Sequence, residues 1–312
     1  MSAEGRGSYE SRQAPDLQEV LGYLEQGRNW GRWGEDDQVG APNLITEEKV
    51  REATALVAQG RSISLSRPVM ISPDDAPDPR WGYVMNRLPE RSGGAGSDDV
   101  LTLGCHGLTV THLDALGHLW DASGMWGGRP STEVVTDRGL TWGGIEHWRN
   151  GLVTRGVLLD VPGHRNAPYV ALGEPVHGWE LDEICDAQGV DVGPGDAVLA
   201  YCGRDRWEAA EPGGVERPER PGLHASCLRF LSERDTPMLV WDMIDAAPHG
   251  YPIPWAVHGA ISNFGIALVD NADLAALATT CRAEGRFEFM LVVAPLVVVG
   301  ATGTPVNPLV IW

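Results

Sequence analysis

Cysteine is scarce in this chain of 312 residues. There are five cysteines, an odd number, and no two of them form a CxxC pair. A small protein held together by disulfides carries more cysteines at closer spacing, and a thiolate zinc site needs paired ones. Neither is expected here, and most of the five are expected to be small buried side chains.

Basic charge is scarce as well. Lysine and arginine number 24 against 43 aspartates and glutamates, which gives a formal net charge of −19. Nucleic acids and anionic membrane surfaces both attract basic patches. The charge therefore argues against either partner and favours a small-molecule substrate.

Long apolar runs are also missing, although 43% of the residues are hydrophobic, which is ample for a buried core. The longest run, FMLVVAPLVVVGA at 289–301, is too short to span a bilayer and is broken by a proline. The first residues, MSAEGRGSYESRQ, lack the basic start, apolar middle and cleavage site of a secretory signal. We therefore expect a cytoplasmic protein.

Local sequence patterns predict the secondary structure of the first third of the chain. Residues 1–15 are polar and are predicted to be a disordered tail, with one domain over 16–312. Apolar spacing predicts helices over 16–27 and over 43–60, the second capped by Thr46 and stopped by Gly60. A strand is predicted over 61–69. The proline- and glycine-rich residues 72–99 predict a long functional loop.

Strands and helices alternate through the rest of the chain. Short apolar segments predict strands over 155–161, 196–203 and 238–244. Helical patterns cover 177–190, 224–235 and 271–285, and 287–302 closes the chain as strands. We find no internal repeat and no linker, so the prediction is an α/β fold with one main sheet.

Histidine is concentrated in one place, where His106, His112, Asp114 and His118 lie within thirteen positions. His112 and Asp114 are two apart, so in an extended segment both side chains point to one side. His118 lies four residues beyond Asp114, one turn along the same face of a helix. Imidazole and carboxylate together suit zinc, manganese or iron. A catalytic site needs about three protein ligands, so more must come from elsewhere.

The alternative is a structural role for the same segment. It can be a helix with Leu113, Leu116 and Trp120 facing inward, in which the histidines are packed core residues. The spacing of His112 and Asp114 favours a metal, because buried charge is rare unless it is paired or coordinated.

Residues 108–118, LTVTHLDALGH, resemble the signature His-x-Gly-Thr-His-x-Asp-x-Pro-x-His of the cyclase-type metal-dependent hydrolases, which include bacterial kynurenine formamidase and isatin hydrolase. RWGEDDQVGAPNLIT (32–46) and GATGTPVNP (300–308) are similar to further family motifs, so the resemblance spans nearly the whole chain. It implies a swivelling β/β/α fold with a central mixed sheet, a divalent metal, and a homo-oligomer, dimer or tetramer.

The resemblance also implies ligands. The family's distal ligands, a histidine and a glutamate twelve residues later, match His258 and Asp270, with aspartate in place of glutamate. Leu108 stands where the family has its first ligand histidine, and His106 is a possible extra ligand in its place. The expectation is one zinc or manganese ion held by His112, Asp114, His258 and Asp270, with two ions or none as alternatives.

Further roles are predicted for other residues. The resemblance assigns the general acid/base to His118, with a structural histidine as the alternative. Trp30, Trp33 and Asn43 are candidates to line the substrate pocket, or else pack in the fold. Arg204 is a candidate to hold a substrate carboxylate, with a surface ion pair as the alternative. Asp242 and Asp245 end a predicted strand, where they can line the site or cap the next turn.

Three functions remain open. The first is hydrolysis of an amide, lactam or lactone bond in a small cyclic or aromatic substrate by metal-activated water. The second is a non-hydrolytic cyclase or dehydratase of secondary metabolism with reduced or absent metal. The third is a silent small-molecule-binding protein. No local nucleophile motif supports a serine or cysteine hydrolase.

Overall fold

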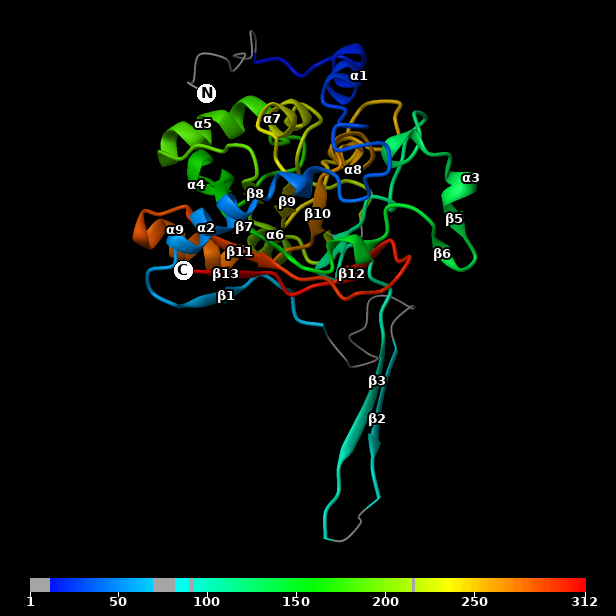
Figure 1. The fold of residues 1–312 in the computed structure, drawn as a ribbon. Helices are drawn as coiled ribbons and strands as arrows, with labels where there is room; N and C mark the ends of the chain where they lie inside the picture. Colours follow the sequence, from blue (N-terminus) through cyan, green and yellow to red (C-terminus); the bar gives the residue numbers. More distant parts are fainter. Residues whose placement is uncertain (1–11, 70–81, 90–92, 215–216) are drawn as a thin grey trace.

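The fold is built on one sheet of nine strands (Figure 1). The structure is a computed structural model that describes residues 12–69, 82–89, 93–214 and 217–312. Residues 1–11, most of the predicted tail, lie outside the described residues. The predicted α/β fold with one large mixed sheet is confirmed.

The strands stand in the order β1-β13-β11-β7-β8-β9-β10-β4-β12. Strands β7 to β10 run parallel to one another, and all other pairs in this sheet are antiparallel. Their bounds are β1 (Ser62–Ser64), β4 (His112–Asp114), β7 (Leu152–Asp160), β8 (Ala197–Tyr201), β9 (Met238–Trp241), β10 (Ala267–Asp270), β11 (Glu288–Val293), β12 (Gly303–Pro305) and β13 (Leu309–Ile311). The three predicted central strands are thus β7, β8 and β9.

The central strands are mostly apolar because both faces of the sheet are covered. One hydrophobic core joins the sheet to α1 (Leu17–Gln26), α5 (Gly178–Gln188), α7 (Cys227–Glu233) and α8 (Ala260–Phe264). The other core joins the opposite face to α9 (Ala275–Glu284). Figure 1 shows the first group of helices stacked on one side. The remaining α-helices are α2 (Glu47–Ala55), α3 (Ser131–Val134), α4 (Val161–Arg165) and α6 (Arg204–Ala210).

The second predicted helix is shorter than expected. Thr46 caps α2 as predicted, since its hydroxyl accepts a hydrogen bond from the backbone of Lys49. The helix ends at Ala55 rather than at Gly60, because the backbone N–H groups of Gln59 and Gly60 donate to the carbonyl of Trp312 at the other end of the chain.

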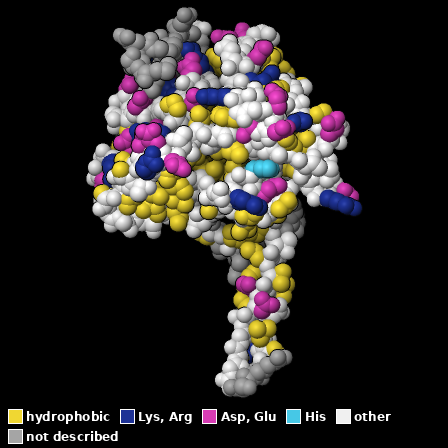
Figure 2. All heavy atoms as spheres, in the orientation of Figure 1, with side chains coloured by type: hydrophobic (Ala, Val, Ile, Leu, Met, Phe, Trp, Pro, Cys, Tyr) yellow, Lys and Arg dark blue, Asp and Glu magenta, His cyan; other side chains and the backbone are white. Residues whose placement is uncertain are grey.

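The loop predicted over 72–99 is wrong in part. Residues 82–87 and 97–102 form an antiparallel hairpin of β2 (Gly82–Arg87) and β3 (Ser97–Thr102), while 70–81 and 90–92 lie outside the described residues. The surrounding prolines and glycines hid two short runs of good strand formers, YVM and VL. The hairpin, here called the arm, projects away from the body and carries apolar side chains along it (Figures 1 and 2).

The last predicted strand segment is also divided. β11 ends at Val293, and Leu296–Val299 form an exposed loop instead of continuing the strand. Pro295 comes two residues after Val293 and cannot donate to the ladder. Strands β12 and β13 come later and have only three residues each, too short for the periodicity to reveal.

Candidate metal centre

The centre is built on two neighbouring antiparallel strands. His112 and Asp114 are the first and last residues of β4, so their side chains project to the same face, as expected from their spacing. In β10, Asp270 is the direct partner of His112 across the ladder. An imidazole and two carboxylates therefore come together on the face that α8 covers.

His112 presents one nitrogen to both carboxylates. Its Nδ1 lies 2.8 Å from the carbonyl oxygen of Val110, so the N–H there donates to the backbone. Its Nε2 lies 3.4 Å from Oδ1 of Asp114 and 3.8 Å from Oδ2 of Asp270. A backbone carbonyl that fixes one ring nitrogen and leaves the other as an acceptor is usual for a metal-ligating histidine.

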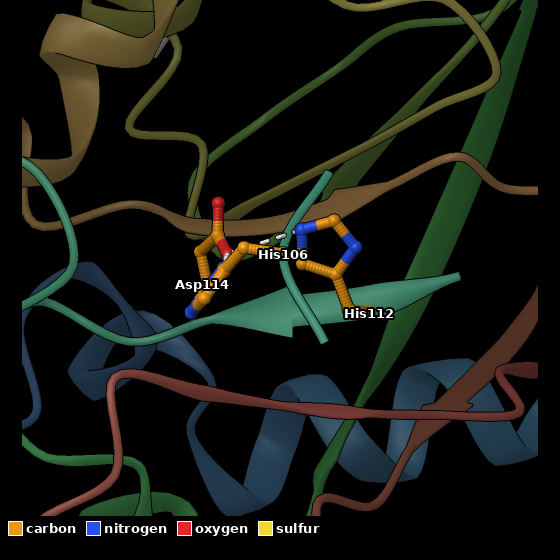
Figure 3. A group of neighbouring side chains, drawn as sticks. All are labelled: His106, His112 and Asp114. Carbon is orange, nitrogen blue, oxygen red and sulfur yellow. Dashed lines mark ion pairs between the residues drawn. The ribbon is translucent and has the colours of Figure 1, made fainter. Parts of the chain in front are cut away.

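His106 enters the cluster from the segment between the arm and β4 (Figure 3). Its Nδ1 lies 2.8 Å from Oδ1 of Asp114, and its Nε2 lies 2.8 Å from the hydroxyl of Thr302. Leu108 presents its carbonyl to the guanidinium of Arg204. The structure thus brings an imidazole into the cluster from two residues upstream of Leu108, and its role as a ligand stays a prediction.

His258 supplies the third imidazole, from the short 3₁₀ helix η6 (Val257–Gly259). Its Nε2 lies 3.2 Å from Oδ2 of Asp270, and its Nδ1 bonds to the carboxylate of Asp245. The indole N–H of Trp241 donates to the other oxygen of Asp270. Asp245 thus orients a candidate ligand, and the sequence did not reveal that pairing because thirteen residues separate the two.

These side chains form two overlapping groups with metal-binding geometry. His106, His112 and Asp114 form one, and Asp114, His258 and Asp270 form the other, with the ligand atoms of each group within 4.8 Å of one another. The shared Asp114 is wholly buried, and its Oδ2 has no hydrogen-bond partner among the described residues. An orphaned buried carboxylate oxygen is costly unless a cation compensates it, so the residues fit a divalent metal.

The charges of the group also fit a cation. Burial lowers the pKa of His106, but the Asp114 carboxylate more than offsets this and raises it to about 10. Burial likewise opposes the charge on His258, yet Asp245 and Asp270 hold its pKa well above the usual value. Both histidines therefore carry a proton against a carboxylate, and a divalent ion that binds here would displace these protons.

His118 lies beside the group, in a turn instead of the predicted helix. β4 ends at Asp114, and the backbone N–H of His118 donates to the carbonyl of Ala115. The ring stacks on that of His106 with centroids 3.6 Å apart, and its Nε2 lies 3.8 Å from Asp114. Burial lowers the pKa of His118 to about 4, so the imidazole is neutral and can accept a proton.

A partly exposed tryptophan, Trp255, lies next to the centre, and the sequence did not single it out for the pocket. The ring of Trp255 lies 6.2 Å from that of His258, and its indole N–H donates to the carbonyl of Trp120. Trp120 is 38% exposed and Trp255 is 37% exposed. An aromatic face that is open to solvent beside polar ligands is typical of a small-molecule site.

The predicted pocket residues of the amino-terminal segment have structural partners. Trp30 donates its indole N–H to the carbonyl of Ser262, and Trp33 packs against Trp126. The Asn43 amide donates to Asp37. These contacts match the packing alternative, and a role of the three residues in the pocket stays a prediction.

Arg204 and Asp242 are buried parts of the scaffold. The Asp242 carboxylate accepts backbone N–H bonds from Cys202, Gly203 and Arg204, which caps the start of α6. The Arg204 side chain is 4% exposed, and its guanidinium pairs with the Glu208 carboxylate and donates to Asn271 and to the carbonyl of Leu108. The ion pair considered for it therefore exists, although the guanidinium is buried, and a role in holding a substrate carboxylate stays a prediction. Arg204 also fixes the loop that follows His106.

A second histidine cluster lies away from this centre and has a structural role. The Ser226 backbone N–H donates to Nδ1 of His224, and Nε2 of His224 lies 3.2 Å from the hydroxyl of Tyr251. That hydroxyl donates to the carbonyl of Pro15, just before α1. The network requires a neutral His224, and burial lowers the pKa of this residue to about 4.

This cluster predicts acid sensitivity. Because the pKa of His224 is lower in the folded than in the unfolded chain, the unfolded state binds more protons between about pH 6.5 and about pH 4, and stability falls as the pH falls through that window. Between about pH 7 and about pH 5 the loss from this residue is about 2 kcal/mol. Urea unfolding at both pH values should show a loss smaller by that amount in His224→Gln than in the unsubstituted protein. The exposed His147→Gln is the control, and equal losses in all three proteins would contradict the prediction.

Comparison with known proteins gives a match to one family and likenesses to solved structures. The family described as putative cyclase matches residues 51–248. A crystal structure described as a novel cyclase has a TM-score of 0.81 at 26% identity, over 93% of this chain and 99% of that one. An isatin hydrolase bound to the product analogue thioisatinate has a TM-score of 0.53 at 16% identity, over 85% and 98%. Isatin hydrolase A from Labrenzia aggregata, bound to benzyl benzoate, has the same TM-score and identity over 84% and 98%.

A search of curated proteins gave no match. None of the helices in the described ranges is both long and apolar enough to cross a bilayer.

Proposed function

The chain belongs to the putative-cyclase family, and from this premise we propose that it is a metal-dependent hydrolase of an amide, lactam or lactone bond in a small aromatic or cyclic substrate. Family membership and the hydrolase neighbours support an enzyme of the hydrolase or cyclase type. The main support for a metal is the environment of Asp114. This residue is wholly buried, belongs to both ligand groups and has an oxygen without a hydrogen bond among the described residues.

The proposed ligands divide between the two groups. His112 and His106 face Asp114 from one side, and His258 and Asp270 complete the other. Imidazole with carboxylate suits zinc or manganese, and the shared carboxylate allows one ion or two. A bound divalent ion lowers the pKa of a coordinated water from about 15.7 toward about 7 and polarises the carbonyl under attack.

The remaining residues position groups and move protons. The neutral imidazole of His118, next to Asp114, takes the proton of the attacking water and returns it to the leaving nitrogen or oxygen. Asp245 fixes the orientation of His258 through Nδ1. Trp255 offers an aromatic face at the edge of the centre, which is why we propose a flat aromatic substrate.

A cyclase or dehydratase is the second candidate. It is favoured by the departures from the hydrolase signature, leucine at position 108 and aspartate at 270, which alter the ligand set around the same fold. Under this function the same His118 would transfer a proton within a substrate instead of between water and substrate.

Metal content and hydrolysis together test the proposal. Protein purified without added metal is expected to carry one or two zinc or manganese ions per chain by elemental analysis, and to hydrolyse at least one of isatin, an aryl formamide and an aromatic lactone. A chelator should abolish turnover and lower Tm, and the metal should restore both, because bound metal stabilises only the folded state. Retained activity without an ion would support the second candidate. Absence of both metal and turnover would leave a binding protein.

A further inference from the structure

An open cleft of about 520 Å³ lies at the carboxyl ends of the parallel strands β7 and β8. Tyr201 is the last residue of β8, and Pro162 follows the last residue of β7 by two positions. The other walls are the start of α6 and one face of α9, and the described residues that line the cleft are all different from those of the metal centre. Open α/β sheets bind ligands in the crevice outside the carboxyl ends of their strands, and this volume suits a small molecule.

Two guanidinium groups line this cleft and keep unused donors. Arg282 pairs with Asp160 through Nε and Nη2, and its Nη1 forms no hydrogen bond within the described ranges. Arg206 lies two residues beyond the buried Arg204, and its side chain is 72% exposed. Its Nε lies 3.4 Å from Oδ2 of Asp205, and its two Nη atoms have no partner in the part of the chain that the structure describes. A ligand in the cleft therefore meets free N–H donors.

The acidic groups beside these guanidiniums are already bound by protein donors. Oδ1 of Asp205 accepts the hydroxyl of Tyr201 at 2.8 Å. Oδ1 of Asp160 accepts the backbone N–H of Gly163 as well as Nη2 of Arg282. The two carboxylates balance the two guanidiniums in charge, but the donors outnumber the acceptors that are left for a ligand. The ligand that matches free guanidinium donors is an anion with oxygen acceptors, such as a carboxylate.

Much of the remaining lining is small and apolar. It includes Pro162, Ala167, Pro168, Ala275 and Ala276. We propose that the cleft binds a small organic carboxylate, with the carboxylate group on Arg206 and Arg282 and the apolar body on these prolines and alanines. A planar guanidinium can hold a carboxylate through two parallel hydrogen bonds. The inference does not depend on the proposed function, because it uses none of the residues of the metal centre.

Isothermal titration calorimetry with sodium benzoate tests the proposal, and benzamide is the uncharged analogue. Benzoate is expected to bind with a Kd of about 1 mM or lower, and benzamide at least about tenfold more weakly because it lacks the negative charge. Arg206→Gln should raise the Kd of benzoate by about tenfold. Arg51→Gln is the matched control and should leave the Kd unchanged. The Arg51 side chain is 71% exposed and pairs with an acid on its own helix, as Arg206 does, but it does not line the cleft.

A second variant fills the cleft without changing its charge. Ala276 is exposed on α9 and lines the cleft, and leucine preserves the helix. Ala276→Leu should raise the Kd of benzoate by at least about tenfold, because the added atoms occupy the space of the ligand. Ala283→Leu is the control, since Ala283 is exposed on the same helix but lies outside the lining. Circular dichroism checks that each variant is folded.

Three results would each overturn the proposal. They are no detectable binding of benzoate, equal affinity for benzamide, and a Kd of benzoate that is the same in Arg206→Gln and Ala276→Leu as in the unsubstituted protein. The third result is also the one expected if benzoate binds at the metal centre instead of in the cleft.

Discussion

Asp114→Asn is expected to remove bound metal and turnover together. The substitution keeps the size of the side chain but takes away the negative charge shared by both ligand groups. Loss of a hydrogen-bond partner of a ligand costs about 10- to 100-fold in metal affinity, so loss of the central ligand should cost at least about 100-fold. Metal content by elemental analysis and hydrolysis of the best substrate are the two measurements.

The control for this variant is Asp36→Asn, because the Asp36 side chain is fully exposed. It should keep both metal and turnover. His112→Gln provides a second test at the same centre and should also lose the ion, since Nε2 faces both carboxylates. Full metal occupancy in folded Asp114→Asn would show that the buried carboxylate is structural and that the centre has been misassigned.

The chain's own sequence predicts the part of the centre that follows from local geometry. His112 and Asp114 are two apart, and the alternation of a strand is enough to place both on one face. Resemblance adds His258 and Asp270. The pairing of β10 with β4 brings Asp270 beside His112, and His258 reaches Asp270 from η6. The apolar segments of the central strands likewise predict one main sheet.

The other parts of the centre and of the fold depend on contacts between distant segments. No periodicity in the sequence predicts such contacts. His106 joins the cluster because the chain before β4 bends toward Thr302, nearly two hundred residues away. Asp245 contributes to the centre only because its loop contacts η6, where its carboxylate bonds to His258. Arg204 donates to the carbonyl of Leu108, a contact between residues 96 positions apart. The arm was hidden because short strand-forming runs lay among prolines and glycines.

His118→Gln is expected to separate proton transfer from metal binding. The residue lies beside Asp114 and stacks on His106, yet belongs to neither metal-binding group. Glutamine preserves a hydrogen bond but cannot carry a proton, so kcat should fall by about 10²- to 10⁴-fold. KM and metal content should change little, because the ligands remain in place.

The exposed His147→Gln is the matched control and should leave kcat unchanged. Measurement of kcat, KM and metal content in the two variants then assigns the role of His118. If the ion is lost from His118→Gln, the residue is a ligand and the proton must move through another group. If both kcat and metal are unchanged, the stacked imidazole only packs against His106, and the proposed acid–base step has no residue in this centre to perform it.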